Sequence, residues 1–162
     1  FQGMPDVNVQ DNFHKKGDFS DTQATQVQRG LEKLGNNFEL HVGFFADTIP
    51  EIETSRPDIR FSLVHIDADL YESILDALKY CYPRMASGAI IVFDDYGSPT
   101  CLGAKKAVDE FFHNKPETVM QLSGPQYGCV VGGGIFFKKL GENMSLLSRG
   151  GTLGRWIFDR SE

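Results

Sequence analysis

The chain has 162 residues, 41% of them hydrophobic, and a formal net charge of −6 at pH 7. This length fits one globular domain that buries a core, and the acidic balance argues against nucleic acids and anionic membranes as partners, because both require a basic surface. No apolar run reaches the roughly 18 residues of a membrane span, no charged and then apolar leader opens the chain, and the three widely spaced cysteines indicate reduced thiols in a cytoplasmic protein.

The first 45 residues contain signals for a loop, a helix and a strand. Residues 1–19 are polar and have no clear period, which predicts a loop or a lid. Apolar side chains at Val27, Leu31 and Leu34 recur at spacings of four and three, so we expect a helix over 21–34. Apolar and polar residues then alternate over 38–45, which predicts a strand.

The middle of the chain predicts alternating strands and helices. Residues 61–66 form a nearly continuous apolar run, as expected for a central parallel strand. Asp69 and Glu72 have the spacing of a capping pair, which predicts a helix that ends near Pro83. This order of elements indicates an α/β fold with a parallel sheet.

The pattern continues to about residue 138. Residues 89–93 predict a second strand, and residues 104–112 predict a second amphipathic helix. Two further strand candidates, 119–122 and 130–138, flank a turn-rich segment. We therefore expect the sheet to end in an antiparallel hairpin.

Acidic residues follow both predicted parallel strands. Asp67 and Asp69 come after the first, and Asp94 and Asp95 come after the second. The carboxyl ends of parallel strands meet at one edge of a sheet, so these carboxylates should converge. Two bare carboxylates about 4 Å apart repel by roughly 4 kcal/mol at an effective dielectric near 20. Because neither motif contains Lys or Arg, we expect a divalent cation held by oxygen ligands. His65, within the first strand, is expected to be a hydrogen-bonded core residue.

Two motifs carry a resemblance to a known family. His-x-Asp-x-Asp-Leu-Tyr-Glu-Ser at 65–73 and Asp-Asp-Tyr-Gly at 94–97 resemble the macrocin O-methyltransferase family. Shorter matches bring the resemblance to about residues 1–112, and they lie at 16–19, 43–48, 82–84 and 104–111. Members of this family use S-adenosylmethionine to methylate sugar or phenolic hydroxyls of natural products. The resemblance implies a Rossmann-like class I methyltransferase fold.

The resemblance also implies a metal site and a base. By position, a magnesium ion would be held by Asp67, Asp94 and Asp95, with Asp67 also the candidate general base. A Lewis-acidic cation lowers the pKa of a hydroxyl and fixes its position, and a nearby carboxylate accepts the proton. Asp69 is expected to cap the following helix instead.

The cofactor site implied by the resemblance is incomplete in this sequence. Gly43, Phe44 and Phe45 would contact the adenine of S-adenosylmethionine. The family's first strand, with its Gly-rich turn, and its acidic second strand have no counterpart here. We therefore expect residues 1–162 to form a single, partial methyltransferase domain that lacks its first two strands and binds S-adenosylmethionine weakly or not at all.

Missing strands would also change the neighbours of 38–45, because the family places its third strand beyond the first two. We expect 38–45 to pair directly with a neighbouring strand, or the chain to form a homo-oligomer across the exposed edge.

Three other functions are consistent with parts of this sequence. A catalytically inert fragment would keep the acidic residues without binding cofactor. A haloacid-dehalogenase-like phosphatase also has Asp-x-Asp after a strand, as in Asp67-Ala68-Asp69, but Tyr71 replaces its expected Thr or Val. A metal-assisted glycosyltransferase is the weakest candidate, because three-residue motifs arise easily by chance. The partner expected for the main hypothesis is a small-molecule hydroxyl acceptor.

Overall fold

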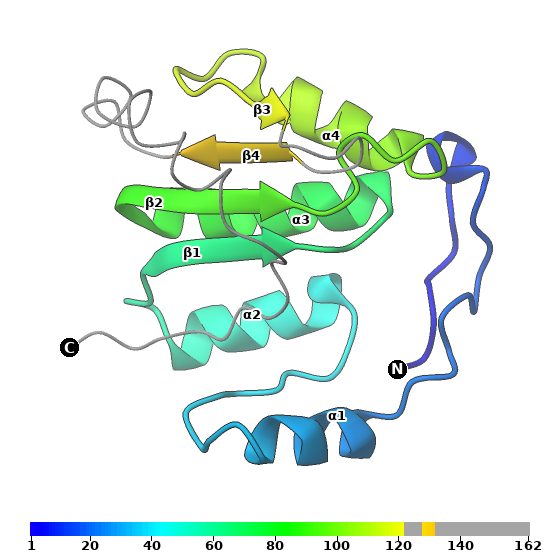
Figure 1. Ribbon diagram of the computed structural model, residues 1–162, viewed down its shortest axis with the longest axis vertical. Helices are drawn as coiled ribbons and strands as arrows, with labels where there is room; N and C mark the ends of the chain where they lie inside the picture. Colours follow the sequence, from blue (N-terminus) through cyan, green and yellow to red (C-terminus); the bar gives the residue numbers. More distant parts are fainter. Residues whose placement is uncertain (122–127, 132–162) are drawn as a thin grey trace, which may run out of the picture.

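A computed structural model describes residues 1–121 and 128–131 of the chain, and it contains one four-stranded sheet (Figure 1). The strand order is β1-β2-β4-β3. β1 (Phe61–Ile66) and β2 (Met85–Phe93) are parallel, whereas β4 (Gly128–Val131) runs antiparallel to β2. β3 (Met120–Gln121) pairs antiparallel with β4. The predicted α/β architecture with a parallel pair of strands is therefore confirmed.

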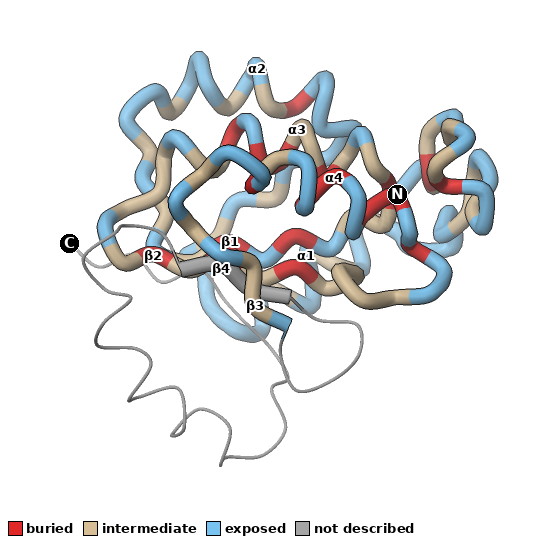
Figure 2. The backbone as a smooth tube through the Cα atoms, turned by 90° about the horizontal axis from the view of Figure 1, so that it is seen from above, coloured by how far each residue is buried: buried red, intermediate tan, exposed pale blue. Residues whose placement is uncertain are grey.

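Two helices cover one face of this sheet. They are α3 (Tyr71–Cys81), which follows β1, and α4 (Leu102–Phe112), which follows β2. Figure 2 shows most of the buried residues between these helices and the strands. The contacting side chains of the core are Val64, Ile66, Ile74, Ala77, Leu78, Ile91, Phe93, Cys101, Ala104, Ala107, Val108 and Phe112. Burial of this apolar surface is the main stabilising contribution to the fold.

The apolar stripes of the two helices explain this packing. Ile74, Ala77 and Leu78 recur at spacings of three and one along α3 and are all buried. In α4, Ala104, Ala107 and Val108 follow the same pattern. Such spacing places the side chains on one side of each helix, so both helices bury one face and expose the other.

The outer face of β1 is less buried than its sequence indicates. Val64 and Ile66 are buried, but the intervening His65 is exposed. Successive side chains of a strand point to opposite faces, and among the described helices α3 and α4 cover only one face of the sheet. The prediction that His65 is a core residue is therefore wrong, although its hydrogen bonding is observed.

Two further helices lie beyond the β1 side of the sheet (Figure 1). α1 (Ala24–Glu32) has no buried residue, and α2 (Phe45–Ser55) packs beside α3. The strand predicted at 38–45 is not formed, because this segment is irregular and Phe45 already begins α2. A strand needs a partner for its backbone groups. Among the described residues, the edge of β1 away from β2 pairs with no strand.

The start of α3 also differs from the prediction. Leu70 is the N-cap residue and makes no side-chain cap, while Asp69 adopts a left-handed backbone with φ of 52°. The carboxylate of Asp11 instead accepts a hydrogen bond from the Tyr71 N–H at 3.0 Å. The predicted Asp69 and Glu72 capping pair is therefore wrong. A buried residue 60 positions earlier supplies the cap.

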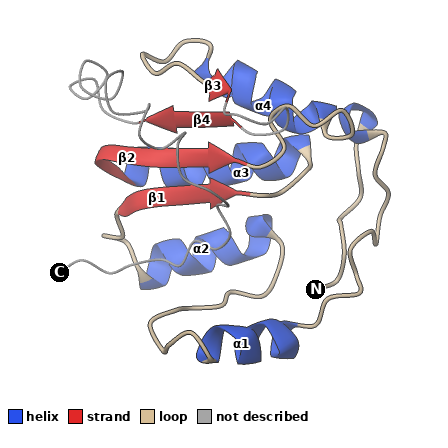
Figure 3. Cartoon of the chain, in the orientation of Figure 1, coloured by secondary structure: helices blue, strands red, loops and turns tan. Residues whose placement is uncertain are grey.

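Residues 1–19 contain one short 3-10 helix, η1 (Val9–Asp11), and otherwise form loops and turns (Figure 3). A second 3-10 helix, η2 (Tyr82–Arg84), follows α3 where Pro83 was expected to end it. β3 lies within the expected strand 119–122, and β4 begins two residues before the expected strand 130–138, of which residues 132–138 lie outside the described part of the chain, as do residues 122–127. A terminal hairpin therefore remains a prediction. Within the described residues, no helix is both long and apolar enough to cross a bilayer.

Candidate acidic site and adjoining cavity

The parallel pairing of β1 and β2 brings the acidic residues to one edge of the sheet. Figure 3 shows both strands ending on the same side, in loops. Ile66 pairs with Phe93, and the Asp94 N–H donates a hydrogen bond to the carbonyl of Ile66 at 3.0 Å. The carboxylates that follow each strand are therefore held close together, as the sequence indicates.

Three of these carboxylates form a compact cluster. Asp67, Asp69 and Asp95 each present an oxygen atom, and the three oxygens lie within 4.8 Å of one another. Asp67 is solvent-accessible, whereas Asp69 and Asp95 are half-buried. This separation suits oxygen ligands arranged around one divalent cation.

The electrostatics of the cluster fit a cation. The pKa of Asp95 is raised to about 7, mainly by burial and next by the negative charge of Asp69. One oxygen of that side chain, Oδ2, is buried and has no hydrogen-bond partner among the described residues. Partial burial and the charges of Asp94 and Asp69 likewise raise the pKa of Asp67. A divalent cation would neutralise this repulsion and give the buried oxygen a partner.

Asp94 takes a different position from the one its sequence motif implies. Its Oδ1 lies 3.2 Å from Nε2 of His65, and its carboxylate is outside the three-oxygen cluster. Asp69, whose backbone is left-handed, occupies the cluster in its place. The structure thus brings together two of the three predicted ligands, with Asp94 adjacent through its charge on Asp67.

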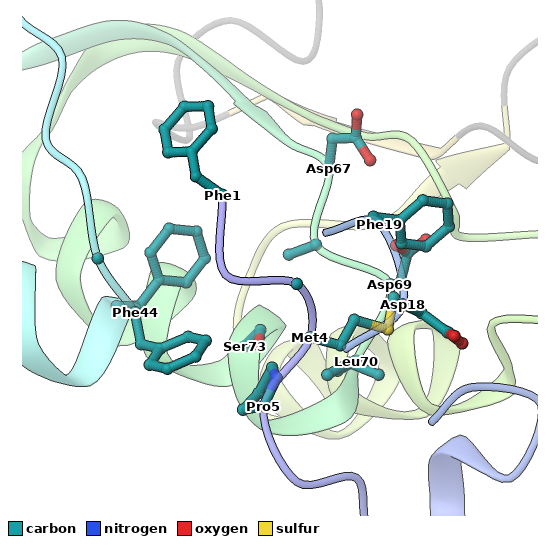
Figure 4. A pocket seen from close by; sticks show the side chains of 14 residues that line it. Phe1, Met4, Pro5, Asp18, Phe19, Phe44, Asp67, Asp69, Leu70 and Ser73 are labelled. Carbon is teal, nitrogen blue, oxygen red and sulfur yellow. The ribbon is translucent and has the colours of Figure 1, made fainter. Parts of the chain in front are cut away.

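A cavity of about 290 Å³ opens beside the acidic cluster. Asp67 and Asp69 line one side of it, and Phe1 and Phe44 lie together across from them (Figure 4). The remaining lining residues are Gly3, Met4, Pro5, Asp18, Phe19, Gly43, Phe45, Ala68, Leu70 and Ser73. The cavity therefore combines carboxylates with aromatic rings, a pairing that suits a flat or cationic ligand.

All three predicted cofactor residues line this cavity. Phe44 and Phe45 are each 39% exposed, which is unusual for phenylalanine and leaves their rings open to a ligand. Gly43 has no room for a side chain, because a Cβ atom would lie 2.7 Å from the methyl group of Thr48. Their part in binding S-adenosylmethionine remains a prediction.

The N-terminal segment forms one wall of the cavity, and its residues were not among the site residues predicted from the sequence. The Met4 N–H donates to the Asp18 carbonyl at 2.8 Å, and the Gly17 N–H donates to the Met4 carbonyl at 3.0 Å. A Cβ atom on Gly3 would lie 2.6 Å from the carbonyl oxygen of Gly17, so only glycine permits this approach. The signal in the sequence was the two glycines, both of which have positive φ.

The fold is similar to that of solved class I O-methyltransferases. A solved structure of the O-methyltransferase NovP superposes with a TM-score of 0.67 at 25% sequence identity. That match covers 82% of this chain and 57% of the NovP chain. The profile of the macrocin O-methyltransferase family matches residues 1–122. The chain belongs to this family, which confirms the resemblance drawn from the motifs.

Curated relatives are also named as O-methyltransferases. Mycinamicin III 3''-O-methyltransferase from Micromonospora griseorubida is 30% identical over 123 residues, covering 68% of this chain and 46% of the relative. The 8-demethyl-8-(2,3-dimethoxy-alpha-L-rhamnosyl)-tetracenomycin-C 4'-O-methyltransferase from Streptomyces olivaceus is 30% identical over 114 residues, covering 64% and 42% respectively. The chain thus spans less than half the length of the curated relatives it matches.

Proposed function

We propose that this chain is part of an S-adenosylmethionine-dependent O-methyltransferase that acts, with a divalent metal, on a sugar or phenolic hydroxyl of a small natural product. The observation that carries the proposal is the cluster of Asp67, Asp69 and Asp95 at the rim of an aromatic-lined cavity. Family membership and the relatives' names support the reaction class.

The acidic residues have two different roles in activating a hydroxyl, namely proton acceptance and metal binding. Asp67 is accessible from the cavity, where its carboxylate can accept the proton of an acceptor hydroxyl. Asp69 and Asp95 hold the opposite side of the cluster, with Asp94 kept beside it by His65. Asp67, Asp69 and Asp95 would hold a divalent cation here, Mg²⁺ by its preference for oxygen ligands, and the ion would supply Lewis acidity.

The aromatic side of the cavity suits the methyl donor. S-adenosylmethionine has a flat adenine and a positively charged sulfur, and both interact favourably with aromatic faces. Phe44 is the N-cap residue of α2 and Phe45 is its first residue. Both rings are therefore held by the start of a helix beside the cavity. Phe1 and Phe19 complete the aromatic lining from the N-terminal segment.

A catalytically inert fragment is the second candidate. It is favoured by the unpaired edge of β1, since the described residues include no strand with a Gly-rich turn on that side. Calorimetry with S-adenosylmethionine separates the two candidates. Saturable binding supports the enzyme, and the absence of binding together with a retained Mg²⁺ site supports the fragment.

Transfer of a radiolabelled methyl group from S-adenosylmethionine to a panel of sugar and phenol acceptors tests the activity directly. We expect product only with a divalent metal present, and a 10²- to 10⁴-fold loss of rate in Asp67→Asn. Asp58→Asn, an exposed change before β1, is the matched control. A fully active Asp67→Asn variant would remove Asp67 from the mechanism, and phosphate release from a generic phosphate ester would favour the phosphatase instead.

A further inference from the structure

A second group of potential metal ligands lies next to the acidic cluster and contains nitrogen and sulfur donors. His14, Asp69 and Cys101 each offer one atom, and these atoms lie within 4.8 Å of one another. They come from the N-terminal segment, the turn after β1 and the N-cap of α4. Three segments far apart in sequence therefore converge on one point.

The distances match the edges of a tetrahedral zinc site. His14 Nε2 lies 3.6 Å from Cys101 Sγ, and Cys101 Sγ lies 3.4 Å from Asp69 Oδ1. Zinc bonds of about 2.3 Å to sulfur and 2.0–2.2 Å to nitrogen or oxygen place such atoms about 3.5 Å apart at tetrahedral angles. The ligands need little movement to accept an ion.

We propose that His14, Asp69 and Cys101 form a site for a borderline transition-metal ion such as Zn²⁺. Imidazole and thiolate favour such ions over Mg²⁺, which prefers oxygen ligands. Cys101 is 3% exposed, so the thiol would be shielded from oxidation while His14 and Asp69 remain half-buried and reachable. Three protein ligands leave a fourth position for water or an exogenous ligand, as in catalytic zinc sites.

The site shares Asp69 with the acidic cluster but differs from it in chemistry. The other members of that cluster, Asp67 and Asp95, offer only oxygen atoms. Mg²⁺ and Zn²⁺ are therefore expected to select different partners for Asp69. This inference does not depend on methyl transfer, because the ligands and the test concern metal binding alone.

Cobalt substitution gives a direct readout of the sulfur ligand. Purified, metal-free chain is titrated with Co²⁺, whose bond to a cysteine thiolate produces a near-ultraviolet charge-transfer band. We expect one Co²⁺ per chain with this band, which Cys101→Ser abolishes and Cys81→Ser leaves intact. No band in the unaltered chain, or a band that survives Cys101→Ser, would overturn the site. The measurement on the unaltered chain does not depend on the folding of any variant.

Zinc calorimetry in excess Mg²⁺ then tests the other ligands and the distinction from the acidic cluster. We expect His14→Gln to weaken Zn²⁺ binding at least tenfold, with circular dichroism confirming that the fold is kept. His113→Gln, an exposed change after α4, is the matched control. Displacement of Zn²⁺ by Mg²⁺, or unchanged affinity in His14→Gln, would contradict the proposal.

Discussion

At the scale of single residues, Asp67, Asp69 and Asp95 present their oxygens to one point, and Asp94 lies beside them against His65. The motifs implied Asp67, Asp94 and Asp95, whereas the geometry groups Asp69 with Asp67 and Asp95. Sequence spacing placed all four residues at the correct edge of the sheet, because strand ends are readable from apolar runs. It did not show which carboxylate turns toward the cluster, since that depends on the left-handed φ at Asp69 and on the contact between His65 and Asp94.

The two sets of ligands make different predictions for Mg²⁺ binding. If the observed cluster holds the ion, Asp95→Asn should weaken Mg²⁺ binding at least tenfold, and Asp94→Asn should weaken it less because that carboxylate contacts His65. Isothermal titration of both variants measures this. Equal losses would restore Asp94 as a ligand.

Without metal, the Asp95→Asn variant should have a higher melting temperature than the unaltered chain, because the substitution removes repulsion among the three acids.

Cys81 offers a test of burial that is independent of the site. Burial raises the pKa of this thiol to about 11, and the nearby Arg84 partly opposes that rise. At pH 8 only about one molecule in a thousand is thiolate, the reactive form. We expect slow labelling by iodoacetamide that speeds up about tenfold per pH unit up to about pH 11. Mass spectrometry of the modified peptide measures it, with urea-unfolded chain as the fast control.

At the scale of elements, apolar runs identified the core correctly and isolated patterns did not. β1 begins and ends where the run 61–66 does, and α4 starts two residues before the predicted 104 and ends at the predicted Phe112. The alternation over 38–45 gave no strand, because pairing depends on a neighbour that the pattern itself cannot supply. No local signal indicates that Asp11 caps α3.

The buried position of Asp11 against α4 predicts that two glycine substitutions change the free energy of unfolding in opposite directions. Gly103, in the first turn of α4, lies against the Asp11 carboxylate, and a Cβ atom there would overlap it. Gly103→Ala should therefore lower the free energy of unfolding by about 1–3 kcal/mol. Gly30→Ala in α1 meets nothing within 4 Å and should raise it by about 0.5–1 kcal/mol.

Urea titrations of both variants measure these changes. Asp11→Ala should also destabilise the chain, by about 0.5–2 kcal/mol for the lost cap. If Gly103→Ala were as stable as the unaltered chain, Asp11 would not occupy the position described.

At the scale of the whole molecule, the edge of β1 that pairs with no strand among the described residues predicts self-association. An unpaired strand edge exposes backbone donors and acceptors, and Leu34 and Val42, 49% and 50% exposed, lie in the segment between α1 and α2. We expect sedimentation velocity to show a concentration-dependent dimer or larger species that Val42→Lys weakens. Thr54→Lys, on the exposed side of α2, should have no effect. A monomer at all concentrations would contradict the homo-oligomer expected from the sequence.

The cap formed by Asp11 also turns one backbone amide into a reporter for the entire N-terminal segment. The first amides of a helix have no partner within the helix, so the Tyr71 N–H depends on Asp11. Residues 1–19 carry both this carboxylate and part of the cavity wall. If the segment lifts to admit a ligand, hydrogen–deuterium exchange at Tyr71 should accelerate while exchange at Leu78, deep in α3, stays slow.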